Sequence, residues 1–413
     1  MIQRSTAWLL AAMLASLPVA AAEPTWTTSW YAAPQPSWGP AFALPTNVPP
    51  VLAAQTVRET LRTSAGGGSL RVMLSNRYGK APLVIGEARV ARTREAQAAT
   101  QGAGAGLRFG GQPGVTIPPG GSALSDPVDF RTEALERLSV SLWLPGRAAL
   151  DSFHWGAQQT AWLAQGNQSA AELMSAAQPM HGRSFVSALH VSGPAGATLV
   201  AFGDSITDGN GSTPDANRRW PDYLAERLAP HGIAVANAGI SGARLLADGM
   251  GVKAAERFRH DVLEQPGVKA VVILMGINDI GWPRSAFAPQ DAPMTAERMI
   301  GAYRQLIAMA HEHNVKVIGA TLLPYEGSLH GTPFSGHYTP EKDAVRREVN
   351  EWIRSSGAFD AVADLDAVTR DPSHPSRLLA RYDSGDHLHP GDEGYRAIAE
   401  SFSLEQLRAM VAP

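Results

Sequence analysis

A continuous apolar run passes directly into a polar loop flanked by glycines in the stretch Leu-Val-Ala-Phe-Gly-Asp-Ser-Ile-Thr-Asp-Gly at residues 199–209. The run predicts a strand buried on both faces, as in parallel sheets. In such sheets ligands bind beyond the carboxyl ends of the strands, so Ser205 can project its hydroxyl group into a crevice there. Glycines on both sides permit close approach of a substrate. The alternative is a polar strand-to-helix turn in which Ser205 only caps a helix.

The C-terminal part of the sequence repeats this alternation of apolar runs and segments of helical length. Further apolar runs lie at residues 233–236, 270–275 and 315–323, and the helix-length segments are 220–229, 252–264, 295–313 and 340–354. Pro221 favours a helix start and Gly232 a helix stop. Strands apolar on both faces that alternate with helices predict a parallel sheet covered on both sides. We therefore expect an α/β domain over residues 193–413.

The N-terminal part of the sequence has a different period, of two residues. Leu70, Val72 and Leu74 share one face of a predicted strand, and residues 138–144 alternate in the same way. Such alternation is typical of half-buried antiparallel strands, and turns rich in glycine and proline separate them. We expect a β-sandwich or jelly-roll-like domain over residues 23–192.

Residues 1–22 have the pattern of a secretory signal peptide. Arg4 precedes an apolar stretch at residues 7–17 that is too short to span a bilayer, and Ala20 and Ala22 follow in an Ala-x-Ala-like arrangement. We predict cleavage near Ala22 and a secreted or periplasmic protein. An uncleaved anchor is the alternative. No later segment is long and apolar enough to predict a stable membrane span.

Composition argues against several classes of function. The 413 residues carry a formal net charge of -3, which argues against a nucleic-acid partner because such proteins usually carry a basic surplus. The chain has no cysteine, which removes thiolate nucleophiles, cysteine zinc sites and disulfides. A hydrophobic content of 44% is typical of a globular protein with a substantial core.

A serine hydroxyl is a weak nucleophile until a base takes its proton, and the candidate base lies near the C-terminus. In the stretch Asp-Ser-Gly-Asp-His-Leu-His-Pro at residues 383–390, Asp386 and His389 are three positions apart. In a helical or turn-like segment this spacing places both side chains on one side. The carboxylate can then hold one imidazole nitrogen while the other faces Ser205.

His387 leaves two alternatives to this pairing. It could itself be the base, but it directly follows Asp386 in the sequence, which makes the pairing geometry harder. On an extended strand His387 and His389 would share a face and could ligate a metal. No further set of histidines and carboxylates accompanies them, so we expect no metal site.

Acyl transfer also needs hydrogen-bond donors for the oxyanion that develops in the transition state. Two loops that follow later apolar runs can supply them, Asn-Ala-Gly-Ile-Ser-Gly at residues 237–242 and Gly-Ile-Asn-Asp at residues 276–279. A glycine offers an unobstructed N–H group and an asparagine side chain an amide donor. Each loop alone is weak evidence, since both residue types are ordinary in loops. Their placement after successive parallel strands is the stronger evidence.

Four blocks in this order resemble those of the SGNH hydrolases, also called the GDSL lipase/esterase family. The blocks are Gly203-Asp204-Ser205, Ile240-Ser241-Gly242, Gly276-Ile277-Asn278-Asp279 and Asp386-His387-Leu388-His389. The resemblance implies a flavodoxin-like three-layer α/β/α fold. It also implies an oxyanion hole formed by the N–H groups of Ser205 and Gly242 and the side chain of Asn278.

The sequence departs from the family pattern in three places. Ile206 follows the first block, where the family name has leucine, and Ala243 follows the second, where many members have a polar residue. The second departure leaves local hydrogen bonding near Gly242 open. The N-terminal β region lies outside the family's core fold and resembles the extra β-domain of some secreted members.

The predicted function is that of a secreted serine esterase that forms an acyl-enzyme on Ser205 and needs no cofactor. We expect its partner to be an ester substrate, either O-acetyl groups on a carbohydrate such as an acetylated polysaccharide or a short-chain ester. We further expect the β region to position substrate and to do no chemistry. Several tryptophans of that region could form sugar-stacking surfaces or simply pack the strands: Trp26, Trp30, Trp38, Trp143 and Trp155.

Other functions would use part or all of the same pattern. A lipid esterase, lysophospholipase or thioesterase would combine the same triad with a wide apolar acyl channel. An acyltransferase would pass the acyl group to a sugar hydroxyl instead of water. A non-catalytic binding protein on a hydrolase scaffold is disfavoured, because all four blocks are intact.

Overall fold

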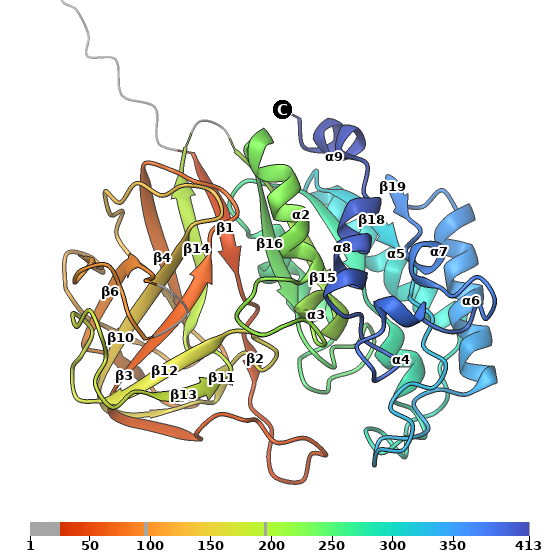
Figure 1. Cartoon of the computed structure of the whole chain (residues 1–413), viewed down its shortest axis with the longest axis horizontal. Coiled ribbons are helices and arrows are strands. Elements are labelled where there is room, and N and C mark those ends of the chain that lie inside the picture. The colour runs from red at the N-terminus through yellow and green to blue at the C-terminus, as the bar shows by residue number, and fades with distance from the viewer. Residues whose placement is uncertain (1–24, 95–97, 194–195, 413) are drawn as a thin grey trace, which may run out of the picture.

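The computed structural model describes residues 25–94, 98–193 and 196–412. The predicted leader at residues 1–22 lies outside these ranges. The chain forms a β-rich N-terminal region and an α/β region, which Figure 1 shows side by side. No helix in the described ranges is long and apolar enough to cross a membrane.

The N-terminal region is a sandwich of antiparallel sheets. One sheet has the order β1-β14-β4-β9 and the other the order β13-β12-β3-β10-β6-β7. The predicted alternation is confirmed in β4, where Leu70, Val72 and Leu74 are fully buried between the sheets. The strands of this region are β1 (Trp26–Tyr31), β2 (Gln35–Pro36), β3 (Val51–Arg62), β4 (Ser69–Ser75), β5 (Leu83–Ile85), β6 (Glu87–Arg92), β7 (Ala105–Gly106), β8 (Val115–Ile117), β9 (Ser122–Leu124), β10 (Arg137–Ala149), β11 (Ser152–Phe153), β12 (Thr160–Gln165), β13 (Gln178–His181) and β14 (Val186–Ser192).

The α/β region contains a parallel sheet of five strands in the order β16-β15-β17-β18-β19. The strands are β15 (Ala197–Gly203), β16 (Ile233–Gly239), β17 (Val268–Leu274), β18 (Lys316–Ala320) and β19 (Ala361–Ala363). β16 follows β15 in the chain and lies on one side of it, whereas β17, β18 and β19 follow on the other side. This is the flavodoxin-like strand order, in which the order reverses direction beside β15. This confirms the predicted fold class. β19 has only three residues at the sheet edge, and no apolar run in the sequence predicted it.

Helices cover this sheet and shape its carboxyl edge. α2 packs with α8, whereas α5 packs with α3 and α6, as expected when right-handed connections place helices on both faces. Thr295 and Thr339 cap the two longest helices, α5 and α6, by accepting a backbone hydrogen bond. The helices are α1 (Ser205–Asp208), α2 (Trp220–Leu228), α3 (Ala254–Phe258), α4 (Ile277–Gly281), α5 (Ala296–Glu312), α6 (Pro340–Ser355), α7 (Leu365–Thr369), α8 (Asp392–Ser401) and α9 (Leu404–Val411).

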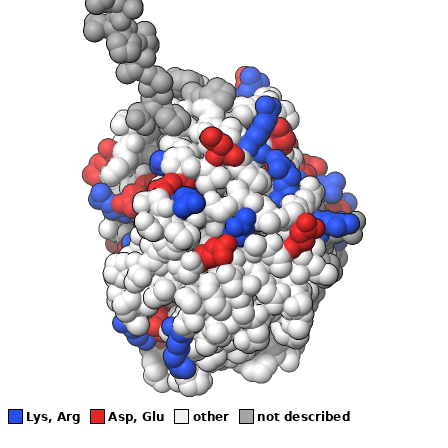
Figure 2. Space-filling model, turned by 90° about the vertical axis from the view of Figure 1, so that its left-hand side faces the viewer, with Lys and Arg blue, Asp and Glu red and all other residues white. Residues whose placement is uncertain are grey.

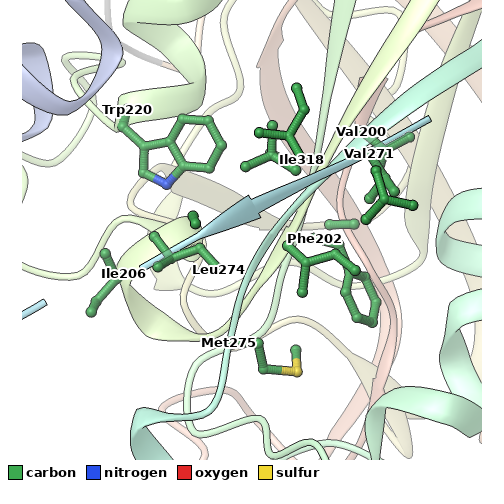
Figure 3. Packing of buried hydrophobic residues seen from close by; sticks show 14 of the residues in the cluster. Val200, Phe202, Ile206, Trp220, Val271, Leu274, Met275 and Ile318 are labelled. Carbon is green, nitrogen blue, oxygen red and sulfur yellow. The ribbon is translucent and has the colours of Figure 1, made fainter. Parts of the chain in front are cut away.

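The core of the α/β region lies directly beneath the loops that carry the four sequence blocks. Figure 3 shows Val200, Phe202, Val271 and Ile318 of three neighbouring strands together with Trp220 of α2 in this buried cluster. Each of these side chains is almost fully buried. Burial of one such side chain stabilises a fold by about 1.5–3 kcal/mol, so the strand ends are held on a rigid base.

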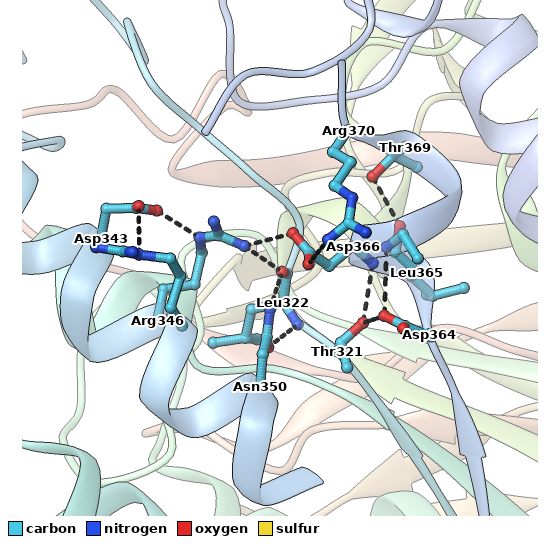
Figure 4. Close-up of polar contacts among 12 residues, drawn as sticks. Thr321, Leu322, Asp343, Arg346, Asn350, Asp364, Leu365, Asp366, Thr369 and Arg370 are labelled. Atoms are coloured by element: carbon cyan, nitrogen blue, oxygen red, sulfur yellow. Dashed lines mark hydrogen bonds and ion pairs between the residues drawn. The ribbon is translucent and has the colours of Figure 1, made fainter. Parts of the chain in front are cut away.

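A buried polar network ties α6 to the backbone that leaves β18. Arg346 is 1% exposed, and its guanidinium group lies 2.7 Å from both Asp343 and Asp366. Asn350 accepts from the N–H group of Leu322 and donates to its carbonyl oxygen, at 2.7 and 2.8 Å. Figure 4 shows that the network joins α6 to α7. Every charged group in it is paired, which a buried arginine requires.

The two regions meet through a shared core. Tyr31, Ala33 and Ala188 of the β-rich region belong to the same buried cluster as the parallel sheet. Tyr31 Oη donates to Asp261 Oδ1 at 2.6 Å, and the Thr28 N–H group donates to the Pro266 carbonyl oxygen at 3.0 Å. The contact is therefore continuous with the folded core, which makes independent motion of the two regions costly.

Figure 2 shows the outer face of the β-rich region. Acidic and basic side chains are interspersed in the upper half of this face, most of its lower half is uncharged, and no continuous basic area is visible on it. A protein that tracks nucleic-acid phosphates would need such an area. This face therefore offers no support for a nucleic-acid partner.

The burial of His190 predicts that the folded protein loses stability in acid. It is buried on β14, where burial and, to a lesser extent, the charge of Arg71 lower its pKa to about 4. In the unfolded chain histidine titrates near pH 6.5. Because the pKa of His190 is lower in the folded state, the contribution of this neutral, buried ring to the unfolding free energy is complete above about pH 6.5. It is lost as the pH falls toward 4, because the unfolded chain then binds the proton more readily. His190→Gln should reduce the acid-induced drop in unfolding free energy between about pH 7 and pH 5 by about 2 kcal/mol, measured by urea unfolding at both pH values. An equal drop in both proteins would contradict this.

Candidate active site

Ser205 is held beyond the end of β15 by a turn that only glycine permits. It is the first residue of α1, and Asp204, between β15 and α1, caps that turn by accepting from the Ile206 N–H group at 3.1 Å. A Cβ atom on Gly203 would lie 2.1 Å from Thr207 Oγ1 and 2.5 Å from the Leu274 carbonyl oxygen. The glycine before the serine is therefore required for the chain to pass between its neighbours.

The C-terminal block brings its histidine to this serine. His389 Nε2 lies 2.8 Å from Ser205 Oγ, and His389 Nδ1 lies 2.6 Å from Asp386 Oδ2. A carboxylate only accepts, so Nδ1 donates to it and the lone pair of Nε2 faces the serine hydroxyl. The serine and histidine are 184 positions apart in the sequence. The structure thus brings together the three residues that the sequence selected as a triad.

Asp386 is held as a carboxylate in this arrangement. Burial favours its protonated form, but hydrogen bonds from the His389 ring and from the backbone N–H groups of His389 and Leu388 outweigh burial. Together they hold the pKa of Asp386 well below its usual range. A permanently charged Asp386 fixes the ring and can stabilise the imidazolium that forms when His389 takes a proton.

His387 pairs with a different carboxylate. Its backbone is left-handed, with φ of +59°, and its Nδ1 lies 2.5 Å from Asp383 Oδ2. The side chain is half exposed and lies against Gly327. In the described part of the chain no group of three or more histidines and carboxylates is arranged to hold a metal ion. The two alternatives that the sequence left open for His387 therefore find no support in this geometry.

The two predicted donor loops meet beside the serine. Asn278 is the second residue of α4, which follows β17; it is 3% exposed and donates from Nδ2 to the carbonyl oxygen of Ala243 at 3.1 Å. Many family members have a polar side chain at the position of Ala243. Here the Ala243 backbone carbonyl makes a hydrogen bond beside Gly242 instead. Gly242 adopts φ of +71°, and a Cβ atom there would lie 2.5 Å from Met250 Sδ. Both conditions require glycine at this position.

Buried aspartates that the sequence analysis did not assign hold these loops in place. Asp279 accepts from the N–H groups of Leu245 at 2.7 Å and Leu246 at 3.0 Å, and its burial raises its pKa to about 6. Burial likewise raises the pKa of Asp204 to about 7. Both residues belong to the sequence blocks quoted above, which was the only signal in the sequence that they matter. Their role in holding the loops could not be predicted, because single carboxylates at strand ends form no periodic pattern.

Comparison with known proteins gives one family match. Residues 201–397 match the model of the GDSL-like Lipase/Acylhydrolase family, and this range contains every residue of the candidate site. No curated protein sequence matches the chain.

Solved structures with some likeness carry related names. A carbohydrate acetylesterase family member from Sinorhizobium meliloti has 18% identity and a TM-score of 0.39, with 52% of this chain and 100% of that chain covered. A GDSL-like lipase from Bacteroides thetaiotaomicron has 18% identity and a TM-score of 0.37, with 51% and 86% covered. An acetyl xylan esterase has 21% identity and a TM-score of 0.36, with 49% and 96% covered.

Proposed function

We propose that this protein is a carboxylic ester hydrolase that cleaves esters through an acyl-enzyme on Ser205, because residues 201–397 match the model of the GDSL-like lipase/acylhydrolase family. The observation that carries this proposal is the hydrogen-bonded chain from Ser205 to His389 to Asp386, at 2.8 and 2.6 Å. Nucleophile, base and orienting carboxylate are the three parts that activate a serine hydroxyl.

The reaction proceeds in two balanced steps. Ser205 Oγ attacks the ester carbonyl carbon while its proton passes to His389 Nε2, and the carbonyl oxygen becomes an oxyanion. Collapse of the tetrahedral intermediate breaks the bond to the alcohol oxygen, which takes the proton from His389 and leaves. Water then attacks the acyl-enzyme with His389 again as base, and the acid departs as Ser205 regains its proton.

The oxyanion is stabilised by three donors in this proposal. They are the N–H groups of Ser205 and Gly242 and the side-chain amide of Asn278. Donors that are fixed before the reaction cost no reorganisation when the charge develops, which makes this kind of stabilisation large. The contact of Asn278 with Ala243 supports the assignment, because it fixes the amide beside the loop that carries Gly242.

The substrate we propose is a short acyl ester, in particular an O-acetyl group on a carbohydrate. Crowding at Gly242 supports a short acyl group, because Met250 and Trp282 fill the space where even a Cβ atom would stand. Partly buried aromatic rings packed around the buried Trp282 support an alcohol side that stacks on rings, as sugars do. This cluster includes Trp38 and Trp155, whereas Trp30 is buried beneath Arg183 and serves packing.

A panel of substrates tests this proposal. Purified mature protein would be assayed on acetyl, butyryl, octanoyl and palmitoyl nitrophenyl esters and on acetylated and deacetylated xylan. We expect kcat/KM to be highest for the acetyl ester and acetate to be released from the acetylated polymer. Highest activity on the octanoyl or palmitoyl ester would instead identify a lipid esterase. Methyl acetate formed in the presence of methanol would reveal acyl transfer.

Export of the enzyme is part of the same proposal. The predicted leader at residues 1–22 supports a secreted or periplasmic protein. Amino-terminal sequencing of protein recovered from the periplasm or medium is expected to begin at Glu23. A mature protein that keeps residues 7–17 would favour an uncleaved anchor.

Asn278→Ala tests the oxyanion assignment. We expect kcat to fall by about 10²–10³-fold with a smaller change in KM, because the lost donor acts chiefly on the developing charge. The measurement is steady-state kinetics on a small acetyl ester, with a melting curve to show that losing the bond to Ala243 leaves the fold intact. A change confined to KM would make Asn278 a substrate-binding residue instead.

A further inference from the structure

A histidine of the β-rich region reaches into the loops of the candidate active site. His154 directly follows β11 and is 5% exposed. Its Nε2 lies 2.9 Å from Asp208 Oδ1, and Asp208, the last residue of α1, is 1% exposed. This contact joins the two regions three residues after Ser205. The serine mechanism described above uses neither residue.

Asp208 also binds the loop that carries Gly242, and so connects His154 to that loop. Its other oxygen, Oδ2, accepts from the Ser241 N–H group at 2.9 Å and from Ser241 Oγ at 2.7 Å. Ser241 immediately precedes Gly242 in the chain. Both carboxylate oxygens of Asp208 are therefore engaged, one by the β-rich region and one by the peptide unit next to the proposed oxyanion donor.

His154 is itself fixed from the other side. Its Nδ1 lies 2.9 Å from the Ala33 carbonyl oxygen. The ring therefore bridges the backbone of the β-rich region to Asp208 and leaves the carboxylate one orientation. Buried polar groups are costly unless they are paired, and both ring nitrogens have a partner.

The backbone of the β-rich region also packs directly against this network. A Cβ atom on Gly156 would lie 2.0 Å from Asp208 Oδ2 and 2.4 Å from Ser241 Oγ, so only glycine fits there. A second contact leads to the same loop, because Gln35 Nε2 donates to the Met250 carbonyl oxygen at 2.5 Å and Met250 crowds Gly242. The loop of Gly242 is thus held from outside its own domain.

We propose that His154 is a positioning residue for ester hydrolysis, which acts through Asp208 and Ser241 to hold the Gly242 N–H group where the oxyanion forms. The β-rich region then completes the active site instead of only positioning substrate, in contrast to the expectation from the sequence. This inference rests on the proposed function, because it takes Gly242 to be an oxyanion donor. A misplacement of about 1 Å in such a group costs up to about 10²-fold in rate.

The test compares three substitutions of His154 in the full-length protein. His154→Ala should lower kcat for a small acetyl ester by about 10–10²-fold while KM stays within about twofold. The affinity of phenylboronic acid, which forms a tetrahedral adduct on the serine, should fall by a similar factor. His154→Gln should recover most of the activity, because its amide replaces Nε2 as a donor to Asp208. His154→Asn, whose amide can replace only Nδ1, should not.

Tyr31→Phe is the matched control. It removes another buried hydrogen bond between the two regions, from Tyr31 Oη to Asp261, without touching the loop of Gly242. We expect a lower melting temperature and unchanged kcat. If Tyr31→Phe lost as much kcat as His154→Ala, the effect would be general loosening of the interface and the proposal would be wrong. Wild-type kcat and boronate affinity in His154→Ala would overturn it equally.

Two further variants keep the result decisive. If His154→Ala does not fold, Ser241→Ala removes one of the two hydrogen bonds that Ser241 donates to Asp208 and should also lower kcat, by a smaller factor, without raising KM; unchanged kcat there would overturn the proposal. Ser205→Ala is measured in parallel. Activity that survives Ser205→Ala would remove the proposed function itself, whereas an inactive Ser205→Ala beside a fully active His154→Ala would remove only this inference.

Discussion

Ser205→Ala is expected to lower kcat by about 10⁴–10⁶-fold while the protein keeps its fold. The substitution removes the atom that forms the acyl bond, and residual rate would come only from binding and the oxyanion donors. Stability should change little, because the hydroxyl group makes one side-chain hydrogen bond, to His389 at 2.8 Å. Kinetics on a small acetyl ester and a melting curve measure both effects. A reactive phosphonate ester should label the wild-type protein at Ser205, as peptide mass spectrometry would show.

Ser212→Ala is a suitable control for this result. Ser212 is a buried serine in the same loop, and its hydroxyl donates to the Gly209 carbonyl oxygen at 2.7 Å. Its substitution removes a hydroxyl group of equal size without removing the nucleophile, so kcat should remain near the wild-type value. Full activity of Ser205→Ala together with labelling at another serine would show that the acyl-enzyme forms elsewhere.

The central sheet and the placement of the four blocks could be predicted because they depend on local patterns. Each apolar run identifies a strand buried on both faces, and parallel strands bring their carboxyl ends to one edge. Any loop that follows such a run therefore reaches the same crevice, however far apart the loops lie in the chain. Gly203 and Gly242 could be identified from the blocks alone, whereas the reason for them is visible only in the structure, where close packing leaves no room for a Cβ atom at either position.

Contacts between the two regions could not be predicted in this way. His154 and Asp208 are 54 positions apart and lie in different regions, and no periodicity links them. Tryptophans posed the same difficulty, because Trp30 and Trp155 look alike in composition. One is buried against Arg183 and the other lies in the half-buried aromatic cluster. Which of two such residues meets solvent is decided by tertiary packing, about which a short sequence window carries no information.

His389→Ala should be nearly as damaging as Ser205→Ala, with kcat lowered by about 10⁴–10⁶-fold. Without the ring no group at 2.8 Å can take the serine proton, and the nucleophile is as weak as a free alcohol. The residues of a triad act as a unit, so the double variant Ser205→Ala/His389→Ala should lose little more activity than either single variant. Single and double variants are compared by kcat on the same acetyl ester.

His387→Ala is the matched control, since it removes a second histidine of the same short segment. The His387 ring is half exposed and is bound to Asp383 at 2.5 Å, whereas His389 contacts Ser205. Its loss should therefore lower kcat only slightly, and a chelator such as EDTA should leave the activity of the wild type unchanged. A large effect of His387→Ala with a mild effect of His389→Ala would exchange the roles of the two rings. Strong inhibition by EDTA would instead mean that His387 and His389 bind a metal together. The structure argues against this, because the two rings are bound to different carboxylates, those of Asp383 and Asp386.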